Sequence, residues 1–174
     1  MSFVLSHQTG IENTHRTTAV ELAAARMMRD ITMTLNDSDL PKNKIRLSFA
    51  EMEKEAYRIS VSEKEILIEA SSDLGFIYAL HFISEEFLGI KPFWFFMDQE
   101  FIKKDSIPIE EKVYFSKTAK IRYRGWFIND EVLLHTWKVD GSDDKPWEMA
   151  FEALLRLGDM EDSLRGHATL HSFT

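Results

Sequence analysis

The sequence contains no cysteine among its 174 residues. This absence excludes disulfide bonds, thiolate nucleophiles and metal sites with cysteine ligands, and it suits a reducing compartment. No apolar run approaches the ~20 residues that a membrane-spanning helix needs. The first residues have no basic region, and their apolar core is too short for a secretory signal. We therefore expect a cytoplasmic protein that does not bind membranes.

Positive charge is also scarce. Lys and Arg number 21 against 29 Asp and Glu, which gives a formal net charge of −8. Binding to nucleic acid needs a basic face that neutralises phosphates, so no nucleic-acid partner is expected. The six histidines show no His-Glu-x-x-His or other metal-ligand spacing, and neither a glycine-rich phosphate loop nor a Gly-x-Ser-x-Gly elbow occurs. We expect no metal and no cofactor.

What the sequence does contain is the pattern of a globular α/β domain, with 44% hydrophobic and 29% charged residues. A helix is expected over residues 18–35, where apolar residues recur at helical spacing and Thr18 with Glu21 forms a capping box. A second helix is expected over residues 73–88, capped by Ser72 or Asp73 and ended by Gly89.

Between these helices lie three short segments in which apolar and polar residues alternate: 45–49, 57–61 and 66–70. Alternation of this kind predicts strands, and residues 62–65 have the composition of a hairpin turn. The order helix, strand, strand, strand, helix predicts an α/β (α+β) fold, with a small sheet and both helices packed on one of its faces. Residues 1–16 are expected to be a loose lead-in or a short edge strand, and residues 105–120 a linker or a connecting strand.

The most aromatic stretch is Phe93-Trp94-Phe95-Phe96-Met97. Aromatic rings can stack on sugars, so a carbohydrate platform is one interpretation of this stretch. We favour the other, in which a strand or loop packs at the interface between this domain and the segment that follows.

That following segment begins with Ile121–Glu131, which is rich in aromatic and β-branched residues and ends in Asn129-Asp130-Glu131. It predicts one β-strand with an acidic end. A helix pattern follows after a loop, with Pro146 at its start. Strand, acidic end, loop and helix make up the first unit of a βα-barrel, whose chemistry lies at the C-terminal ends of its strands.

The string from Tyr123 to Glu131, with the helix ending Leu154-Leu155-Arg156-Leu157-Gly158, is similar to the opening of the catalytic barrel in glycoside hydrolases of the family-115 α-glucuronidase type. Residues 66–95 resemble the α/β domain that precedes the barrel in that family and in hexosaminidase-like enzymes. The resemblance implies a carbohydrate-active parent protein that hydrolyses glycosidic bonds of plant-type polysaccharides or oligosaccharides. It divides the chain into an N-terminal α/β domain (1–119), the first βα unit of an incomplete barrel (120–158) and a tail (159–174) that departs from the family pattern, as after a frameshift or in a truncated gene.

Four residues are candidates for contact with substrate: Arg124, Asn129, Asp130 and Glu131. Glycoside hydrolysis needs two carboxyl groups across the scissile bond. Asp130 and Glu131 are adjacent, and on a strand they point to opposite faces, so they are poor candidates for both members of one pair. The catalytic residues are therefore left unassigned. In the alternative interpretation the acidic end only closes the strand by turn hydrogen bonds, and Arg122 or Arg124 neutralises an acidic neighbour.

The number of residues left for the barrel determines which function we predict. A βα-barrel takes about 250 residues, and only about 55 follow position 119. We expect a non-catalytic N-terminal fragment of a glycoside hydrolase. Two alternatives remain: a stand-alone carbohydrate-binding or protein-interaction module, and a small active glycosidase that uses Asp130 and Glu131.

Self-association is also expected. An open strand edge recruits another strand, and the predicted last helix presents apolar residues without barrel neighbours. A homodimer through this strand and helix is the simplest assembly, unless the N-terminal domain covers the surface itself. The apolar residues of the helix are Trp147, Phe151, Leu154, Leu155 and Leu157.

Overall fold

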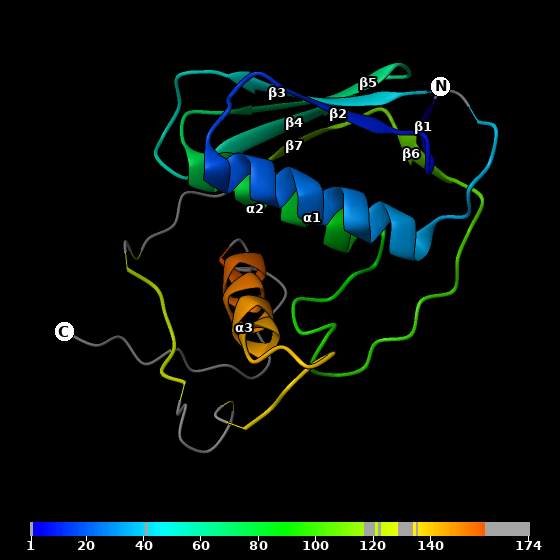
Figure 1. The fold of residues 1–174 in the computed structure, drawn as a ribbon. Helices are drawn as coiled ribbons and strands as arrows, with labels where there is room; N and C mark the ends of the chain where they lie inside the picture. Colours follow the sequence, from blue (N-terminus) through cyan, green and yellow to red (C-terminus); the bar gives the residue numbers. More distant parts are fainter. Residues whose placement is uncertain are drawn as a thin grey trace.

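The computed structural model describes residues 2–40, 42–116, 121, 123–128, 134 and 136–158. Their elements form three layers (Figure 1). A five-stranded sheet makes up the first layer, and helices α1 (Thr18–Thr34) and α2 (Asp73–Glu86) lie together on one of its faces. Helix α3 (Asp144–Leu157) lies on the far side of this helical layer. The α/β fold class is confirmed.

The main sheet has the order β2 (Gly10–Asn13), β3 (Lys44–Phe49), β5 (Glu65–Ala70), β4 (Tyr57–Val61), β7 (Val113–Phe115). Strands β2, β3 and β5 are parallel, whereas β4 runs antiparallel to both β5 and β7. A separate antiparallel pair joins β1 (Ser2–Leu5) to β6 (Ile107–Glu110). The beginning of the chain thus supplies a short edge strand, and the region 105–120 supplies connecting strands.

Alternation along the central strands separates the two faces of the sheet. One face packs on α1 and α2 through aliphatic side chains that are fully buried: Ile45, Leu47, Ile59, Ile66 and Ile68. The opposite face carries ion pairs between neighbouring strands. Lys44 pairs with Glu12 at 2.9 Å, Arg46 with Glu65 at 3.0 Å and Arg58 with Glu69 at 2.6 Å.

Hydrogen bonds from backbone amides to N-cap side chains mark where α1 and α2 begin. The amide of Gly75 donates to the Ser72 hydroxyl at 3.3 Å, so Ser72 is the N-cap of α2 as predicted. The capping box at Thr18 is wrong by one residue. Thr17 has the extended backbone of an N-cap and accepts from the amide of Val20 at 3.4 Å, so Thr18 is already helical and Glu21 lies one position too far for the box.

The strand predicted at Ile121–Glu131 is wrong for the part that the structure describes. Residues 121 and 123–128 belong to no strand, although their alternation persists, with Tyr123 and Phe127 78% and 82% exposed and Arg124 and Trp126 half-buried. A strand needs a neighbour for its backbone hydrogen bonds, and none lies beside this segment among the described residues. The helix that follows is confirmed.

Other predictions fall outside these observations. The tail 159–174 lies outside the described residues, and the division of the chain at 119 and 158 stays a prediction. Within the described ranges no helix is long and apolar enough to cross a membrane. The cytoplasmic location stays a prediction.

Candidate functional site

Of the four predicted substrate contacts, the structure describes only Arg124; Asn129, Asp130 and Glu131 lie outside the described residues. The Arg124 guanidinium donates to a Glu55 carboxylate oxygen at 2.6 Å and to the Tyr78 hydroxyl at 3.3 Å. It also donates to the backbone carbonyl of Ile121 at 2.6 Å. These contacts join the segment 123–128 to the loop before β4 and to helix α2.

The surroundings of Arg124 favour the protonated form of its guanidinium. Burial opposes the charge on Arg124, but hydrogen bonds to Glu55 and Tyr78 outweigh it, and the pKa of Arg124 is raised. Glu55 has a backbone φ of +70°, which a residue other than glycine rarely adopts, so the loop accepts strain where it presents this carboxylate. Arg124 therefore has an acidic neighbour within the protein. Substrate contact by the four residues stays a prediction.

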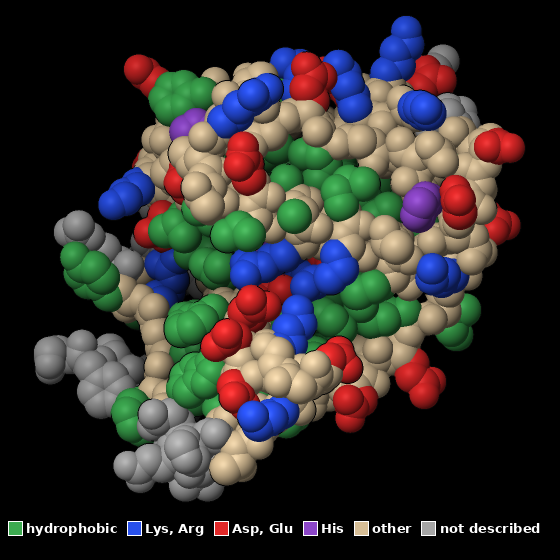
Figure 2. Space-filling view, in the orientation of Figure 1, with side chains coloured by type: hydrophobic (Ala, Val, Ile, Leu, Met, Phe, Trp, Pro, Cys, Tyr) green, Lys and Arg blue, Asp and Glu red, His purple; other side chains and the backbone are tan. Residues whose placement is uncertain are grey.

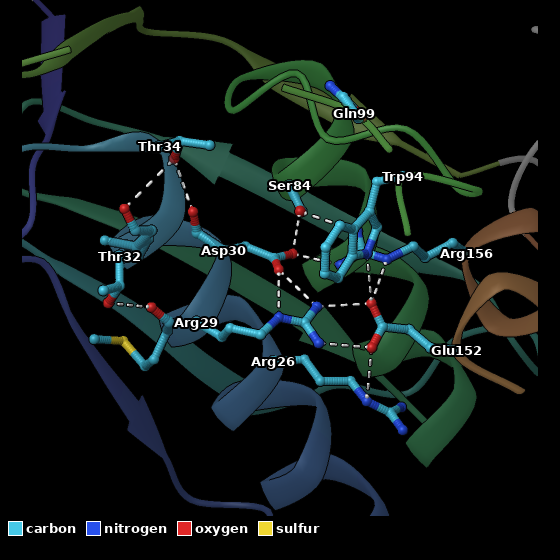
Figure 3. A network of polar contacts seen from close by, with 12 residues as sticks. Arg26, Arg29, Asp30, Thr32, Thr34, Ser84, Trp94, Gln99, Glu152 and Arg156 are labelled. Atoms are coloured by element: carbon cyan, nitrogen blue, oxygen red, sulfur yellow. Dashed lines mark hydrogen bonds and ion pairs between the residues drawn. The ribbon is translucent and has the colours of Figure 1, made fainter. Parts of the chain in front are cut away.

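A second polar cluster lies between the helices (Figure 3). Helix α1 supplies Arg26, Arg29 and Asp30, and α3 supplies Glu152 and Arg156. We call this cluster, together with Ser84 of α2 and Trp94, the ion network. Asp30, Glu152 and Arg156 are at most 3% exposed, so charges are buried where α3 meets the other two helices.

Arg156 is the link from α3 to both other helices. Its guanidinium donates to Asp30 Oδ2 at 2.5 Å, to Glu152 Oε1 at 2.9 Å and to the Ser84 hydroxyl at 3.1 Å. The Ser84 hydroxyl in turn donates to Asp30 Oδ2 at 2.5 Å. Every one of these partners is buried, which makes the contacts strongly dependent on one another.

Arg29 closes the network from the α1 side. It binds both oxygens of Glu152, at 2.9 and 2.7 Å, and it also donates to Asp30 at 2.7 Å. The guanidinium carbon lies 5.0 Å from the centre of the Trp94 ring, whose Nε1 donates to Glu152 Oε1 at 3.1 Å. Arg26 adds a further ion pair to Glu152 at 3.4 Å.

The chemistry of Glu152 follows from these partners. Burial alone would raise the pKa of this carboxyl, but the hydrogen bond from Arg29 and the charge of Arg156 lower it far below its usual range. A general acid in glycoside hydrolysis has a raised pKa and lies across the scissile bond from a second carboxylate. Glu152 is held ionised among arginines, so the network is suited to joining helices and not to proton transfer.

His81 of α2 lies beside the network. It is 4% exposed, and its Nε2 atom is buried without a hydrogen-bond partner among the described residues. Burial and the charge of Arg156 lower its pKa well below the ordinary 6.5, so the ring is neutral. A buried neutral histidine next to several arginines makes the packing of α3 sensitive to pH.

The aromatic stretch after α2 contacts the segment that follows the domain. Phe93 lies 5.5 Å from Trp126, and Phe95 and Phe96 lie 5.6 and 5.8 Å from Trp137, measured between ring centroids. The stretch is a turn-rich loop and not a strand. The interpretation as a loop at this interface is confirmed.

Sequence reasoning missed the ion network. Its one signal is the spacing of Met149, Glu152, Ala153 and Arg156, which lie on one stripe of α3 and are all buried. A glutamate and an arginine four residues apart usually form an exposed pair on a helix, so this stripe did not suggest a buried face.

Comparison with known proteins adds a family match for one segment of the chain and a similar fold. Residues 116–159 match the model of glycosyl hydrolase family 115. The solved structure of a family GH115 4-O-methyl-α-glucuronidase, described as specific for decorated arabinogalactans, has a TM-score of 0.67 at 23% identity, covering 89% of this chain and 25% of that one. A GH20 β-N-acetylhexosaminidase from Streptomyces coelicolor has a TM-score of 0.51 at 14% identity, covering 71% of this chain and 24% of that one. No curated protein matches the sequence.

The predicted resemblance to family 115 is thereby confirmed, and the matched segment contains both the Tyr123–Glu131 string and helix α3. The chain spans about a quarter of the length of the two enzymes.

Proposed function

We propose, from the relationship to glycosyl hydrolase family 115, that this chain is a non-catalytic N-terminal portion of a carbohydrate-active enzyme that holds the first barrel helix in place. The ion network is the observation that carries this proposal. Helix α3, which lies in the segment matching the family, is joined to α1 by ion pairs within the protein and to α2 by the hydrogen bond from Arg156 to Ser84.

The parent enzyme is proposed to hydrolyse glycosidic bonds of polysaccharides or oligosaccharides, with an α-glucuronidase-like specificity. The Tyr123–Glu131 string and the shared fold support this substrate class. The predictions that neither nucleic acid nor a membrane is a partner stay predictions.

Turnover by the purified 174-residue chain tests the proposal. We expect no hydrolysis of glucuronylated xylo-oligosaccharides or of aryl glycosides above the level of an Asp130→Ala/Glu131→Ala double variant. Glu148→Ala, which removes an exposed carboxylate of α3, is the matched control. Turnover that the double variant loses and the control keeps would overturn the proposal and identify a small active glycosidase.

A second copy of the chain is the protein partner that we propose. The surface expected for it is only partly available, because α3 buries Met149, Ala150 and Ala153 on the N-terminal domain. Tyr123, Phe127 and Phe151 remain exposed. Sedimentation at increasing protein concentration is expected to show a weak dimer that Phe127→Glu abolishes, and a monomer at all concentrations would contradict it.

A further inference from the structure

Tyr78 of α2 contacts both the segment 123–128 and the end of α3. Its hydroxyl lies 3.3 Å from the guanidinium of Arg124. A Cβ atom added to Gly158, the C-cap of α3, would lie 2.5 to 2.8 Å from atoms at the tip of the Tyr78 ring. The backbone at Gly158 therefore packs directly on this ring, which is buried.

A close approach of the loop before β4 to helix α2 completes the contact. Gly75 lies one turn before Tyr78, and a Cβ atom there would lie 2.6 Å from the backbone oxygen of Ala56. The loop can approach α2 this closely because Gly75 has no side chain. The approach brings the Glu55 carboxylate within 2.6 Å of the Arg124 guanidinium. Two groups of the N-terminal domain therefore hold Arg124.

These contacts bring the end of α3 near the beginning of the segment. The guanidinium that meets the Tyr78 hydroxyl also donates to the backbone carbonyl of Ile121 at 2.6 Å. In a βα unit the helix returns the chain to the start of the strand, where the next parallel strand begins. The position of Gly158 beside Tyr78 meets this requirement.

The Tyr78 ring couples its two contacts. Gly158 has a helical φ of −60°, which alanine adopts more readily than glycine, so its backbone does not require a glycine. The ring does require one, because a side chain at position 158 would displace it. The hydroxyl that Arg124 contacts would then move as well. None of these three residues belongs to the ion network.

We propose that Tyr78 is a positioning residue, which sets the end of α3 and the segment 123–128 relative to each other. This inference rests on the proposed function and extends it: besides holding α3, the N-terminal domain fixes the geometry from which the barrel of the parent enzyme continues.

Limited proteolysis of the 174-residue chain tests the coupling. Trypsin cleaves after arginine, and the contacts of Arg124 with Tyr78 and Glu55 oppose the local opening that cleavage needs. The readout is the initial rate of cleavage after Arg124, measured by mass spectrometry relative to cleavage after the exposed Lys138. Tyr78→Phe removes the hydroxyl and keeps the ring, and it is expected to raise this rate about fivefold or more.

Gly158→Ala tests whether the end of α3 acts on the segment through the ring. It is expected to raise the rate of cleavage after Arg124, although residue 158 lies outside that segment. Gly10→Ala adds the same methyl group where no atom lies within 4 Å, and it should leave the rate unchanged. In the double variant Tyr78→Phe/Gly158→Ala the two effects should not add, because both act through the same hydroxyl.

Two results would overturn the coupling: a Gly158→Ala variant with an unchanged rate after Arg124, or effects that add in the double variant. Circular dichroism checks that each variant is folded. Where Gly158→Ala is not folded, Tyr78→Phe decides, since an unchanged rate overturns the role of the hydroxyl and a faster one supports it. No glycan takes part in this assay, so turnover by the chain would overturn the proposed function whatever the cleavage rates.

Discussion

Helices α1 and α2 contact their two neighbouring layers in opposite ways. Toward the sheet, α1 buries aliphatic side chains such as Val20 and Ile31, and the ring of Phe82 on α2 contacts those of Tyr57 and Tyr114. Toward α3 they bury charges, and Asp30 and Ser84 bind Arg156 directly. Apolar burial is non-directional and many arrangements satisfy it, whereas a buried ion network is satisfied in only one.

This difference indicates that the two kinds of contact have different effects: apolar burial stabilises the fold, whereas the ion network determines the position of α3. Replacing a buried ion pair by apolar residues is often neutral or stabilising, so the ion network is not needed to make α3 adhere. Its geometry instead fixes where α3 lies, since Arg29 of α1 binds both carboxylate oxygens of Glu152 while Arg156 binds Asp30 and Ser84. On the face of the molecule that is turned to the viewer in Figure 1, basic and acidic side chains form a band with hydrophobic side chains on either side (Figure 2).

The largest effect is expected from breaking the ion network at Glu152. Glu152→Ala leaves the buried Arg156 and the half-buried Arg29 with one carboxylate fewer and is expected to cost about 3–5 kcal/mol in the docking of α3. Hydrogen exchange should show faster exchange of the α3 amides while the sheet stays protected. The control Glu148→Ala breaks only an exposed pair with Lys145 and should cost less than about 0.5 kcal/mol. Equal losses in the sheet and in α3 would contradict this separation.

The apolar layer should respond differently. Ile68→Ala removes fully buried methyl groups between sheet and helices and is expected to cost about 2–5 kcal/mol in the free energy of unfolding. Urea unfolding should show sheet, α1 and α2 losing structure together at a lower midpoint. Leu22→Ala, at a position 54% exposed on α1, should stay within about 0.5 kcal/mol of the original. A loss confined to α3 would show that the two contacts are not separable.

Acidification acts on the ion network through His81. Its native pKa is lowered by burial and by Arg156, so below pH 6.5 the unfolded chain takes up a proton that the folded protein refuses. Arg26, Arg29 and Glu152 also act on the ring. Stability is complete above about pH 6.5 and should fall as the pH decreases from there, by up to about 1.4 kcal/mol per pH unit. Urea titrations from about pH 7.5 to about pH 5, which cover the start of this loss, should lose that slope in His81→Leu.

The smallest effect on stability is expected from substitutions at the N-caps of α2 and α3. Ser72 accepts a hydrogen bond from the Gly75 amide at the start of α2, whereas the Asp143 side chain caps nothing at the start of α3. Ser72→Ala should therefore cost about 1 kcal/mol in thermal unfolding, and Asp143→Ala close to nothing. A similar cost for both would indicate that α3 depends on its own start more than on the ion network.

The same contrast explains what the sequence could predict. The strands β3, β4 and β5 and the helices α1 and α2 were predictable because burial against one apolar layer imposes a period of two residues on a strand and of 3.6 residues on a helix. The segment 123–128 kept its period of two but forms no strand, because alternation reports which side is buried and not whether a neighbouring strand is present.

The ion network was not predictable for a related reason. Arg26, Arg29 and Asp30 have the composition of a solvated helix face, and only the approach of α3 buries them. The partner residues lie more than a hundred positions away in the chain, as the contact of Arg29 with Glu152 shows. For the predicted substrate contacts, only Arg124 can be compared with the structure, and its acidic partner Glu55 lies in a loop that no motif marks.

The ion pairs on the outer face of the main sheet have a consequence for how the domain can be attached. Lys44, Arg46 and Arg58 alternate with Glu12, Glu65 and Glu69 from strand to strand. Exposed apolar side chains on this face, Val113 and Phe115, lie at the β7 edge. Exposed pairs of this kind contribute little to stability. Their effect is to make apolar packing on β2, β3, β5 and β4 costly, because covering these strands would take the charged side chains out of water. We therefore expect a larger protein that contains this domain to join it through the helical side or through the apolar β7 edge.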